Sequence, residues 1–419
     1  MRQIIKRQKQ EKELVASSNF ISRDMAEKIE TYLEQDIIKV VTGVRRCGKS
    51  IFSFMVLQEA DFGYINFDEK ELTALENYDE LLRYIQEFYG NVQYLLLDEV
   101  QNLANWELWV NSLHRRGYNL LITGSNAKLL SRELATHLTG RHISVELFPF
   151  SFREYLRAIG FNVKADYTEE ERGMVLNHLT KYIEVGGFPE VVVKGYDYTY
   201  LQTLFDSIIL KDVVQRYKVR YADELYNLAR FLVSSYSNEV SYTKLKNTLN
   251  LGSVHTVQNY VKYLEDTYLV FHLDRFSFKQ REQVKSPKKM YVLDNGLINA
   301  LAFGFSENTG NLMENTVAVE LLRRKSGSSS RMELYYWKDQ QQREVDFVVK
   351  EGPDISYLIQ VCYNVDDQKT KEREVKSLVR AAGELNCNDL LIITWDEEGE
   401  EEFKGSRIRF VPLWKWLLE

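Results

Sequence analysis

An eight-residue stretch near the N-terminus combines the residue types and the spacing that bind a chain of phosphates. Gly43-Val44-Arg45-Arg46-Cys47-Gly48-Lys49-Ser50 fits the pattern G-x-x-x-x-G-K-[ST]. The glycines of such a loop let consecutive backbone N–H groups turn towards phosphate oxygens, and the following helix adds the positive end of its dipole. Lys49 would reach the β- and γ-phosphates, and the Ser50 hydroxyl would ligate Mg²⁺. We predict that this loop binds ATP through Gly43, Val44, Arg45, Arg46, Cys47, Gly48, Lys49, Ser50 and Ile51.

The flanking segments decide between this function and a surface turn rich in glycine and lysine. Residues 36–42 form a short apolar, β-branched run, which predicts a buried strand, and residues 51–57 can continue as a helix. A strand, a loop and a helix in this order are the context that a phosphate-binding loop requires. Upstream, residues 22–33 predict an amphipathic helix that packs beside the nucleotide base.

A strand is predicted over residues 62–68, and two carboxylates follow a later apolar strand, predicted over residues 92–97. Asp98 and Glu99 follow it directly, and a buried parallel strand delivers such residues to the carboxyl edge of its sheet. Asp98 would hold Mg²⁺ through water, and Glu99 would polarise the attacking water as general base. An acidic turn after a core strand is the alternative for these two residues.

These motifs, together with others downstream, resemble those of one prokaryotic family. They are Gly-Val-Arg-Arg-Cys-Gly-Lys-Ser, Leu-Leu-Leu-Asp-Glu-Val-Gln, Thr-Gly-Ser-Asn, Leu-Thr-Gly-Arg, Leu-Phe-Pro-Phe-Ser-Phe-Arg-Glu-Tyr-Leu and, near the C-terminus, Glu-Val-Asp-Phe. The family is that of AAA+-like (archaeal-type, STAND-related) P-loop ATPases with a C-terminal domain of unknown function. The resemblance covers essentially the whole chain and implies an ATPase core followed by a small helical lid.

Further site residues follow from a third buried strand, predicted within residues 118–126, which ends in polar residues. In AAA+-type ATPases such a residue senses the γ-phosphate, and Ser125 or Asn126 would fit; a polar helix cap is the competing explanation. Downstream, Arg132 and Arg141 could each stabilise transition-state charge, in cis or across a subunit interface of a homo-oligomer. Arg141 is the first candidate, and a surface salt bridge is the alternative.

Composition and charge bound the remaining possibilities. The 419 residues suffice for two or three domains, and 44% hydrophobic with 27% charged residues is ordinary for a soluble globular protein. A net charge of −7 means that any nucleic-acid interface must be local. Three cysteines cannot build a disulfide framework, the six histidines form no zinc motif, and no apolar run spans a bilayer. We expect a cytoplasmic protein without a membrane partner.

The predicted fold class is α/β, with four parts. They are a P-loop (AAA+-like) parallel-sheet ATPase core over residues 1–150, a helical lid over 151–220, a winged-helix domain over 221–308, and a C-terminal α/β restriction-endonuclease-like domain over 309–419. Within the lid, residues 186–189 (Gly-Gly-Phe-Pro) predict a turn where the backbone approaches another element closely.

A winged-helix layout is predicted from helices over residues 225–235, from 241 onwards and over 253–268, with wing strands over 270–273 and 290–293. One interpretation is binding of double-stranded DNA; the other is subunit packing or contact with a protein partner. For DNA, the groove residues would be His255, Thr256, Gln258, Asn259 and Lys262, and the phosphate contacts would be Lys288 and Lys289 with the other basic wing residues Arg275, Lys279, Arg281 and Lys285.

The C-terminal region predicts a helix over residues 311–324, strands over 333–337, 344–350, 357–363 and 390–394, a helix over 371–382 and an acidic turn over 396–402. It resembles the nuclease-like core in which a helix Glu, a strand Asp and Glu-x-Lys hold Mg²⁺. Glu314 and Asp346 occupy the first two positions, but the third reads Gln360-Val361-Cys362. Because two anionic ligands are a thin set for Mg²⁺, we expect a degenerate nuclease site unless Lys369 or Lys371 supplies the missing cation.

The sequence thus predicts an Mg²⁺-dependent ATPase whose nucleotide state switches the C-terminal domains or neighbouring subunits. Three outputs compete: action on DNA, a regulatory or defence-type switch on a protein partner, and an ATP-dependent nuclease. The nuclease is the least favoured because of Gln360 and Cys362.

Overall fold

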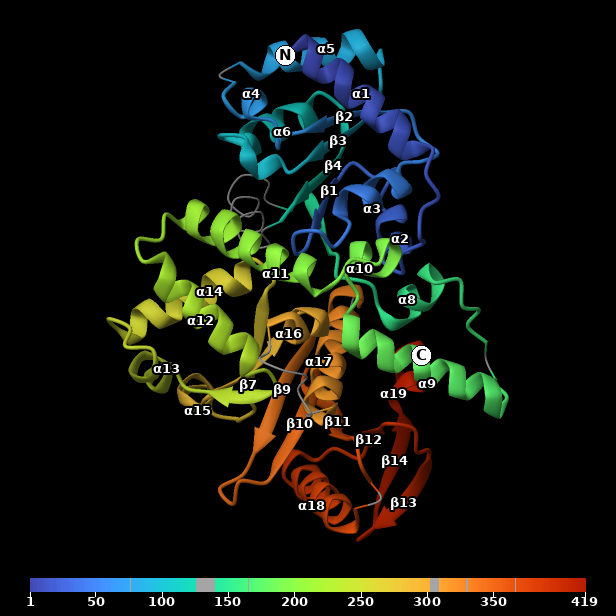
Figure 1. Cartoon of the computed structure of the whole chain (residues 1–419), viewed down its shortest axis with the longest axis vertical. Helices are drawn as coiled ribbons and strands as arrows, with labels where there is room; N and C mark the ends of the chain where they lie inside the picture. The colour runs from blue at the N-terminus through green and yellow to red at the C-terminus, as the bar shows by residue number, and fades with distance from the viewer. Residues whose placement is uncertain (76, 126–139, 165, 302–308, 329–330, 366) are drawn as a thin grey trace. The chain divides into compact units, whose positions relative to one another are not determined.

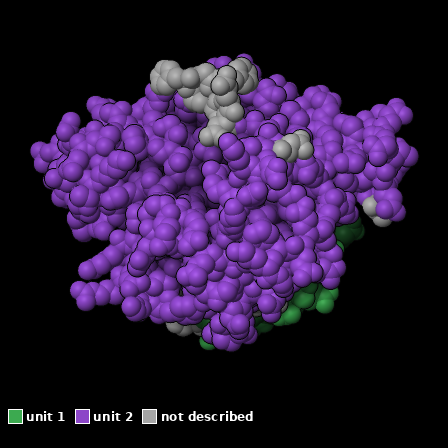
Figure 2. Space-filling model, turned by 90° about the horizontal axis from the view of Figure 1, so that it is seen from below, with its two compact units in different colours: residues 1–149, 266–268 green, residues 150–265, 269–419 purple. Residues whose placement is uncertain are grey.

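The computed structural model describes residues 1–75, 77–125, 140–164, 166–301, 309–328, 331–365 and 367–419 (Figure 1). This part of the chain divides into two compact units, coloured separately in Figure 2. Unit 1 comprises Met1–Pro149 with Asp266–Tyr268, and unit 2 comprises Phe150–Glu265 with Leu269–Glu419. Within the described ranges, no helix is both long enough and apolar enough to cross a membrane.

Unit 1 is built on a parallel sheet. Among the described residues it has five strands in the order β2-β3-β4-β1-β5, and every pairing is parallel. The strands are β1 (Ile38–Thr42), β2 (Phe62–Asn66), β3 (Tyr94–Asp98), β4 (Asn119–Gly124) and β5 (His142–Glu146). Every residue of β1 is buried, as expected for a strand covered on both faces. The sheet confirms the predicted α/β class of a P-loop ATPase core.

Helices cover this sheet (Figure 1). They are α1 (Arg2–Ala16), α2 (Ala26–Glu30), α3 (Lys49–Val56), α4 (Lys70–Thr73), α5 (Tyr78–Tyr89), the 3₁₀ turn η1 (Val100–Asn102) and α6 (Trp106–Arg115). The long helix at the N-terminus is α1, which packs on α5 and β2. The prediction for residues 22–33 was therefore wrong in extent: only the short α2 is helical there, and the basic segment before it forms α1 because Ile5 and Gln8 bury one of its faces.

Unit 2 begins with helices, which confirms the helical prediction for residues 151–220. They are α8 (Phe152–Ala158), α9 (Glu169–Val185), α10 (Pro189–Lys194), α11 (Tyr198–Ser207) and the π-helix η2 (Ile208–Gln215). The break between α9 and α10 is a close approach, as predicted: a Cβ on Gly187 would lie 2.2 Å from the carbonyl oxygen of Phe150. Gly187 also accepts a hydrogen bond from the Phe150 amide at 2.7 Å.

The next elements follow the predicted order of helices and wing strands. They are α12 (Ala222–Ser234), β6 (Asn238–Val240), α13 (Tyr242–Thr248), α14 (Val254–Asp266), β7 (Val270–Arg275), α15 (Gln280–Lys285), β8 (Lys288–Val292) and α16 (Asn295–Leu301). Sequence reasoning missed the short β6 and α15. The apolar stripe of α14 is confirmed, because Val257, Tyr260, Val261 and Leu264 are all buried.

The C-terminal elements complete a mixed sheet that also contains the wing strands. They are α17 (Thr309–Gly327), β9 (Met332–Lys338), β10 (Glu344–Glu351), β11 (Asp354–Cys362), α18 (Gln368–Leu385), β12 (Leu390–Thr394), β13 (Gly399–Phe403), β14 (Ser406–Pro412) and α19 (Leu413–Leu418). Within the described residues this sheet has nine strands, in the order β13-β14-β12-β11-β10-β9-β7-β8-β6. One sheet thus runs through both regions that the sequence suggested as separate domains.

The acidic turn predicted over residues 396–402 was wrong in part. Residues Gly399–Phe403 form the edge strand β13, paired antiparallel with β14. Arg407 of β14 forms an ion pair with Glu400 of β13, so a basic partner strand offsets the acidic run and permits pairing.

Candidate active site

The phosphate-binding loop joins β1 to α3 in unit 1. Gly48 has φ +96° and forms the N-cap of α3, a conformation that side chains rarely adopt. At the other end of the loop, a Cβ on Gly43 would lie 2.1 Å from the carbonyl oxygen of Leu147. A side chain at either glycine would therefore strain the backbone or clash with it. The N-terminus of α3 directly follows the loop, as expected for a phosphate-binding site.

Lys49 is the first residue of α3 and is almost completely buried, with 5% of its surface exposed. Its ammonium donates to the carbonyl oxygens of Gly43 and Val44, each at 3.2 Å. It also lies 3.6 Å from Glu99 Oε1. The loop thus holds the ammonium at its mouth, next to Glu99, which follows β3.

Asp98 ends β3 and is buried at 1% exposure. Its carboxylate accepts hydrogen bonds from the hydroxyls of Ser50, Thr123 and Tyr64. Burial, with the charge of Glu99 adding to it, raises the pKa of Asp98 to about 6. The structure therefore brings the two predicted Mg²⁺ residues, Ser50 and Asp98, into direct contact. A hydroxyl beside a buried carboxylate is a set of hard oxygen donors that fits Mg²⁺.

Glu99 adopts a left-handed backbone conformation, with φ +53°. For a residue with a side chain this conformation is strained, and such strain concentrates at functional sites. The Glu99 amide donates to Thr123 Oγ1 at 3.0 Å, and its carboxylate accepts from the side chain of Gln101. Thr123, in β4, consequently fixes both Asp98 and Glu99; sequence reasoning missed it, although its place near the end of a buried strand was a usable signal.

Ser125 directly follows β4 and is buried at 2% exposure. Its hydroxyl has no hydrogen-bond partner among the described residues. A buried polar atom without a partner is costly unless a ligand satisfies it, which fits the predicted γ-phosphate sensor. The alternative residue, Asn126, and the arginine at position 132 lie outside the described residues.

Arg141 does not lie with these residues. It precedes β5, its side chain is exposed, and its carbonyl oxygen accepts from the amide of Ile38, the first residue of β1. Because β1 and β5 are parallel and in register from Ile38 and His142 to Thr42 and Glu146, Arg141 lies at the edge of the sheet opposite the loop, about 16 Å away at 3.3 Å per residue. The prediction that Arg141 acts on this site in cis is therefore wrong.

Two further residues of unit 1 support the loop and gave no signal in the sequence. The guanidinium of Arg23 donates to the carbonyl oxygens of Cys47, at 3.1 Å, and Phe148, at 2.5 Å. The hydroxyl of Tyr268 donates to Oγ1 of Thr42, the residue before the loop, at 2.8 Å. Both are distant from the loop along the chain, so no local pattern could reveal them.

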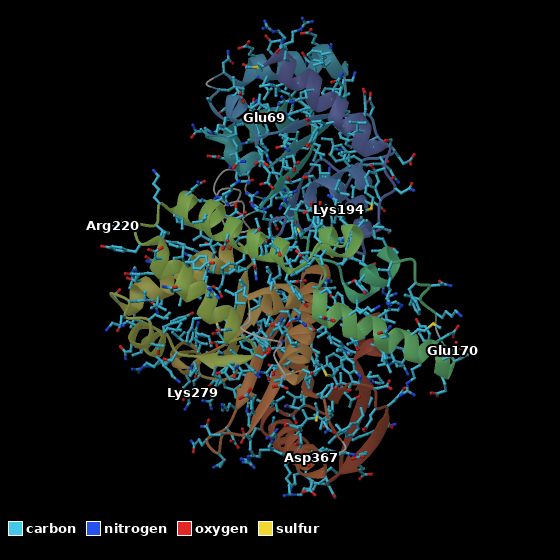
Figure 3. All side chains as sticks on the ribbon, viewed as in Figure 1. Glu69, Glu170, Lys194, Arg220, Lys279 and Asp367 are labelled. Carbon is cyan, nitrogen blue, oxygen red and sulfur yellow. The ribbon has the colours of Figure 1, made fainter. Side chains whose placement is uncertain are left out.

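The residues predicted to contact nucleic acid divide into two groups. On α14, His255, Gln258 and Lys262 are exposed, while Thr256 and Asn259 are partly buried. The side chain of Lys279, 78% exposed, lies at the surface between β7 and β8 (Figure 3). Lys288, in contrast, is partly buried and forms an ion pair with Asp274.

Lys289 lies in the interior of unit 2 and not at its surface. The prediction that it contacts phosphates is wrong, because it is buried at 2% exposure and its ammonium is surrounded by carboxylates. Two of these carboxylates are Glu314 and Asp346, the acids predicted for the nuclease-like site. The other suggested lysines do not reach that site: Lys371 forms an ion pair with Glu401, and neither Lys369 nor Lys371 lines the adjacent cavity.

Comparison with known proteins places the chain among relatives of similar length. It is 37% identical to the uncharacterized protein MJ1544 of Methanocaldococcus jannaschii, across 97% of this chain and 93% of that protein. It is 30% identical to an uncharacterized protein of Haemophilus influenzae, across 93% of this chain and 98% of that one. A family model described as an AAA domain matches residues 35–156, which contain the loop, Asp98, Glu99 and Ser125. The chain belongs to this family of P-loop ATPases.

The remainder of the chain matches two models described only as domains of unknown function. The first, DUF8612, covers residues 176–309, and the second, DUF4143, covers residues 309–416. Among solved structures, the Walker-type ATPase PABY2304 of Pyrococcus abyssi is similar at 17% identity and a TM-score of 0.45, over 67% of this chain and 96% of that one. A likeness this loose says nothing about substrate or partner.

Proposed function

We propose that unit 1 binds ATP with Mg²⁺ and hydrolyses the terminal phosphate bond. The observation that supports this most is the convergence of Lys49, Ser50, Asp98 and Glu99 at the carboxyl ends of β1 and β3. In open parallel sheets, ligands bind at this edge. The residues come from separate segments, so a chance turn does not explain their arrangement.

Each residue has a distinct role in this mechanism. The loop amides and Lys49 bind the phosphates, and Ser50 with Asp98 would hold Mg²⁺, which when bound neutralises charge on the phosphate oxygens. Glu99 accepts a proton from the attacking water, and the unpartnered hydroxyl of Ser125 contacts the γ-phosphate. The 3.6 Å contact with Glu99 keeps the ammonium of Lys49 facing the site.

Arg141 remains a candidate only for a site in another copy of the chain. Its exposed side chain at the far edge of the sheet could complete the site of a neighbour in a homo-oligomer, as arginine fingers supplied in trans do.

The output that we propose is a nucleotide-dependent rearrangement of unit 2 on duplex DNA, in a cytoplasmic setting. Support comes from the element order of a winged helix over residues 222–292 and from the exposed face of α14, where His255, Gln258 and Lys262 lie together. Lys279, Arg281 and Lys285, between β7 and β8, are also exposed. They supply basic side chains at the surface of a chain whose net charge is −7.

A protein partner is the second candidate, favoured by a different observation. Phe278 and Val284, on the same segment between β7 and β8, are 79% and 71% exposed. Exposed apolar side chains of this size are surfaces that a protein partner can cover. An interface of this kind would not depend on phosphate charges.

ATP turnover with and without duplex DNA, at low and at moderate salt, separates the two outputs. We expect DNA to stimulate turnover and the stimulation to fade as salt rises, because phosphate contacts release counterions. Lys262→Ala should reduce the stimulation, whereas Lys194→Ala, an exposed lysine of α10 (Figure 3), should not. Turnover that is indifferent to DNA at both salt concentrations would contradict the DNA output and favour the protein partner.

A further inference from the structure

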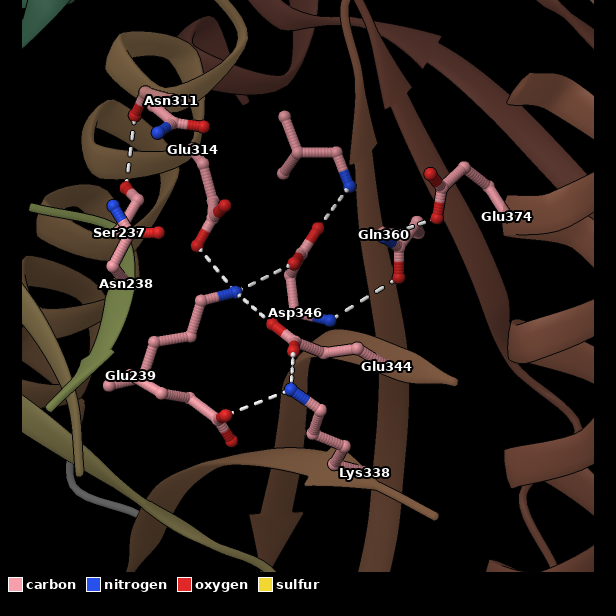
Figure 4. A network of polar contacts seen from close by, with 12 residues as sticks. Ser237, Asn238, Glu239, Asn311, Glu314, Lys338, Glu344, Asp346, Gln360 and Glu374 are labelled. Carbon is pink, nitrogen blue, oxygen red and sulfur yellow. Dashed lines mark hydrogen bonds and ion pairs between the residues drawn. The ribbon is translucent and has the colours of Figure 1, made fainter. Parts of the chain in front are cut away.

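Lys289 lies at the centre of a carboxylate cluster in unit 2. Its ammonium is 2.6 Å from Glu344 Oε1, 2.8 Å from Glu314 Oε1 and 2.9 Å from Asp346 Oδ1 (Figure 4). An ammonium carries three N–H donors and no acceptor. The three carboxylates therefore saturate it, and its side chain is left only 3% exposed.

The cluster connects elements that are not neighbours in the sheet. Lys289 belongs to β8, Glu344 and Asp346 to β10, and Glu314 to α17. Strands β7 and β9 lie between β8 and β10 in the sheet order. The two strands nevertheless approach on one face, since the rings of Tyr291 and Phe347 lie 5.9 Å apart. The ammonium thus joins the wing strands to the C-terminal part of the sheet.

The acids of the cluster are further occupied by partners in the protein. Asp346 Oδ2 accepts from the amide of Val361 at 3.0 Å, and Glu314 Oε1 accepts from the hydroxyl of Tyr291 at 2.7 Å. Glu344 Oε2 lies 3.1 Å from the ammonium of Lys338. Each carboxylate therefore has a basic or hydrogen-bonding partner beyond Lys289, which leaves few lone pairs for another ligand.

The neutral amide at the third nuclease position belongs to the same arrangement. Gln360 accepts from the amide of Asp346 at 3.3 Å and donates to Glu374 Oε2 at 2.8 Å (Figure 4). Glu374 in turn forms an ion pair with Arg373. These residues line one cavity of about 840 Å³ together with Lys289, Glu314 and Asp346.

The distances between the three carboxylates and Lys289 are those of hydrogen bonds to an ammonium. Lys289 Nζ lies at N–H···O distances from all three carboxylates, whereas Mg²⁺ would need oxygens at about 2.0–2.1 Å in octahedral geometry. Burial alone would lower the pKa of Lys289, but Asp346, Glu314 and Glu344 raise it well above its usual value, so the ammonium stays charged.

We propose that the ammonium of Lys289 is the resident cation of this pocket and occupies the place that a divalent metal ion would take among Glu314, Glu344 and Asp346. The pocket is then a lysine-neutralised site that holds the wing strands against the C-terminal strands, and it carries no metal-dependent chemistry. This proposal does not depend on the ATPase site of unit 1. In the competing account, Lys289 is the catalytic lysine of a working nuclease and Mg²⁺ binds beside it.

Removal of the ammonium should therefore create a metal site. We would measure Mn²⁺ binding by electron paramagnetic resonance on the full chain without nucleotide, with Asp98→Asn in every sample to remove the acidic ligand of unit 1. We expect Lys289→Met to bind one Mn²⁺ at least tenfold more tightly than the parent, which is the chain with Asp98→Asn alone. Bound Mn²⁺ should also raise the melting temperature of the Lys289→Met variant. Lys279→Met, an exposed lysine nearby, is the matched control and should behave as the parent does.

Two results would overturn the proposal. One is a folded Lys289→Met variant that binds Mn²⁺ no better than the parent. The other needs no substitution at Lys289. If the chain with only Asp98→Asn binds Mn²⁺, and Asp346→Asn abolishes that binding, then the metal and the lysine share the pocket. This second comparison tests the proposal even if Lys289→Met fails to fold, because the proposal predicts no Mn²⁺ binding at Asp346 while Lys289 is present. In that second case, DNA cleavage that needs Mn²⁺ and is lost in Asp346→Asn would identify the pocket as a working nuclease site.

Discussion

Replacement of Lys49 by alanine is expected to remove most binding of ATP. The ammonium lies at the mouth of the loop, held by the carbonyl oxygens of Gly43 and Val44, and would turn to the phosphates. A hydrogen bond to a charged group contributes about 1.5–3 kcal/mol, which corresponds to a rise in Kd of about 10- to 150-fold. Titration with a fluorescent ATP analogue, or calorimetry with ATP, measures the change.

The control for this substitution is Lys70→Ala, which removes an exposed lysine from α4 of the same unit. It should leave Kd unchanged. Both variants need a melting curve, because Lys49 is buried and its loss could loosen the loop. If Lys49→Ala keeps the wild-type affinity with an unchanged melting temperature, the loop is not the phosphate site.

Replacement of Glu99 by glutamine should separate binding from turnover. The amide keeps the shape of the side chain and its contact with Gln101, but it cannot accept a proton from water. General base catalysis contributes about 10²- to 10⁴-fold, so we expect kcat to fall within that range while ATP still binds. Phosphate release under saturating ATP, together with a binding titration, tests both halves of this expectation.

Glu59→Gln provides the matched control, since Glu59 is exposed just beyond α3. Its turnover should equal that of the wild type. Normal turnover of Glu99→Gln would assign the base to another residue. Loss of binding in Glu99→Gln would instead mean that Glu99 acts mainly by orienting Lys49 through their 3.6 Å contact.

The ATPase core was predictable because its chemistry depends on local patterns. A β-branched run, two glycines at a fixed spacing and a lysine specify strand, loop and helix between Ile38 and Val56. Likewise, Asp98 and Glu99 follow an apolar strand, and parallel strands bring their carboxyl ends to one edge of the sheet. Each inference needed only neighbouring residues and one rule of topology.

The parts that sequence reasoning missed depend on contacts between distant segments. Thr123 binds both acids, and Tyr268 reaches Thr42 from far along the chain; neither interaction leaves a periodic signal. Arg141 was predicted to stabilise charge at the phosphate site, but it precedes β5 at the opposite edge of the sheet. Only the register of β5 on β1 shows this.

Lys289 shows most clearly what the sequence cannot specify. Lys369 and Lys371 are the lysines close to Gln360 in sequence, whereas the cation that reaches Asp346 comes from β8, 57 residues earlier. The sequence predicts phosphate contacts for Lys279 and Lys289 alike. In the structure Lys279 is exposed between β7 and β8, whereas Lys289 is buried within β8.

The measurement that tests the central claim most directly is phosphate release from ATP by the purified wild-type chain, in Mg²⁺ and then in excess EDTA. Because Ser50 and Asp98 meet at the base of the loop, we predict multiple turnovers in Mg²⁺ and their loss in EDTA. Turnover that continues unchanged in EDTA, or that is absent in Mg²⁺ although ATP is bound, would contradict the account of unit 1 as an Mg²⁺-dependent ATPase.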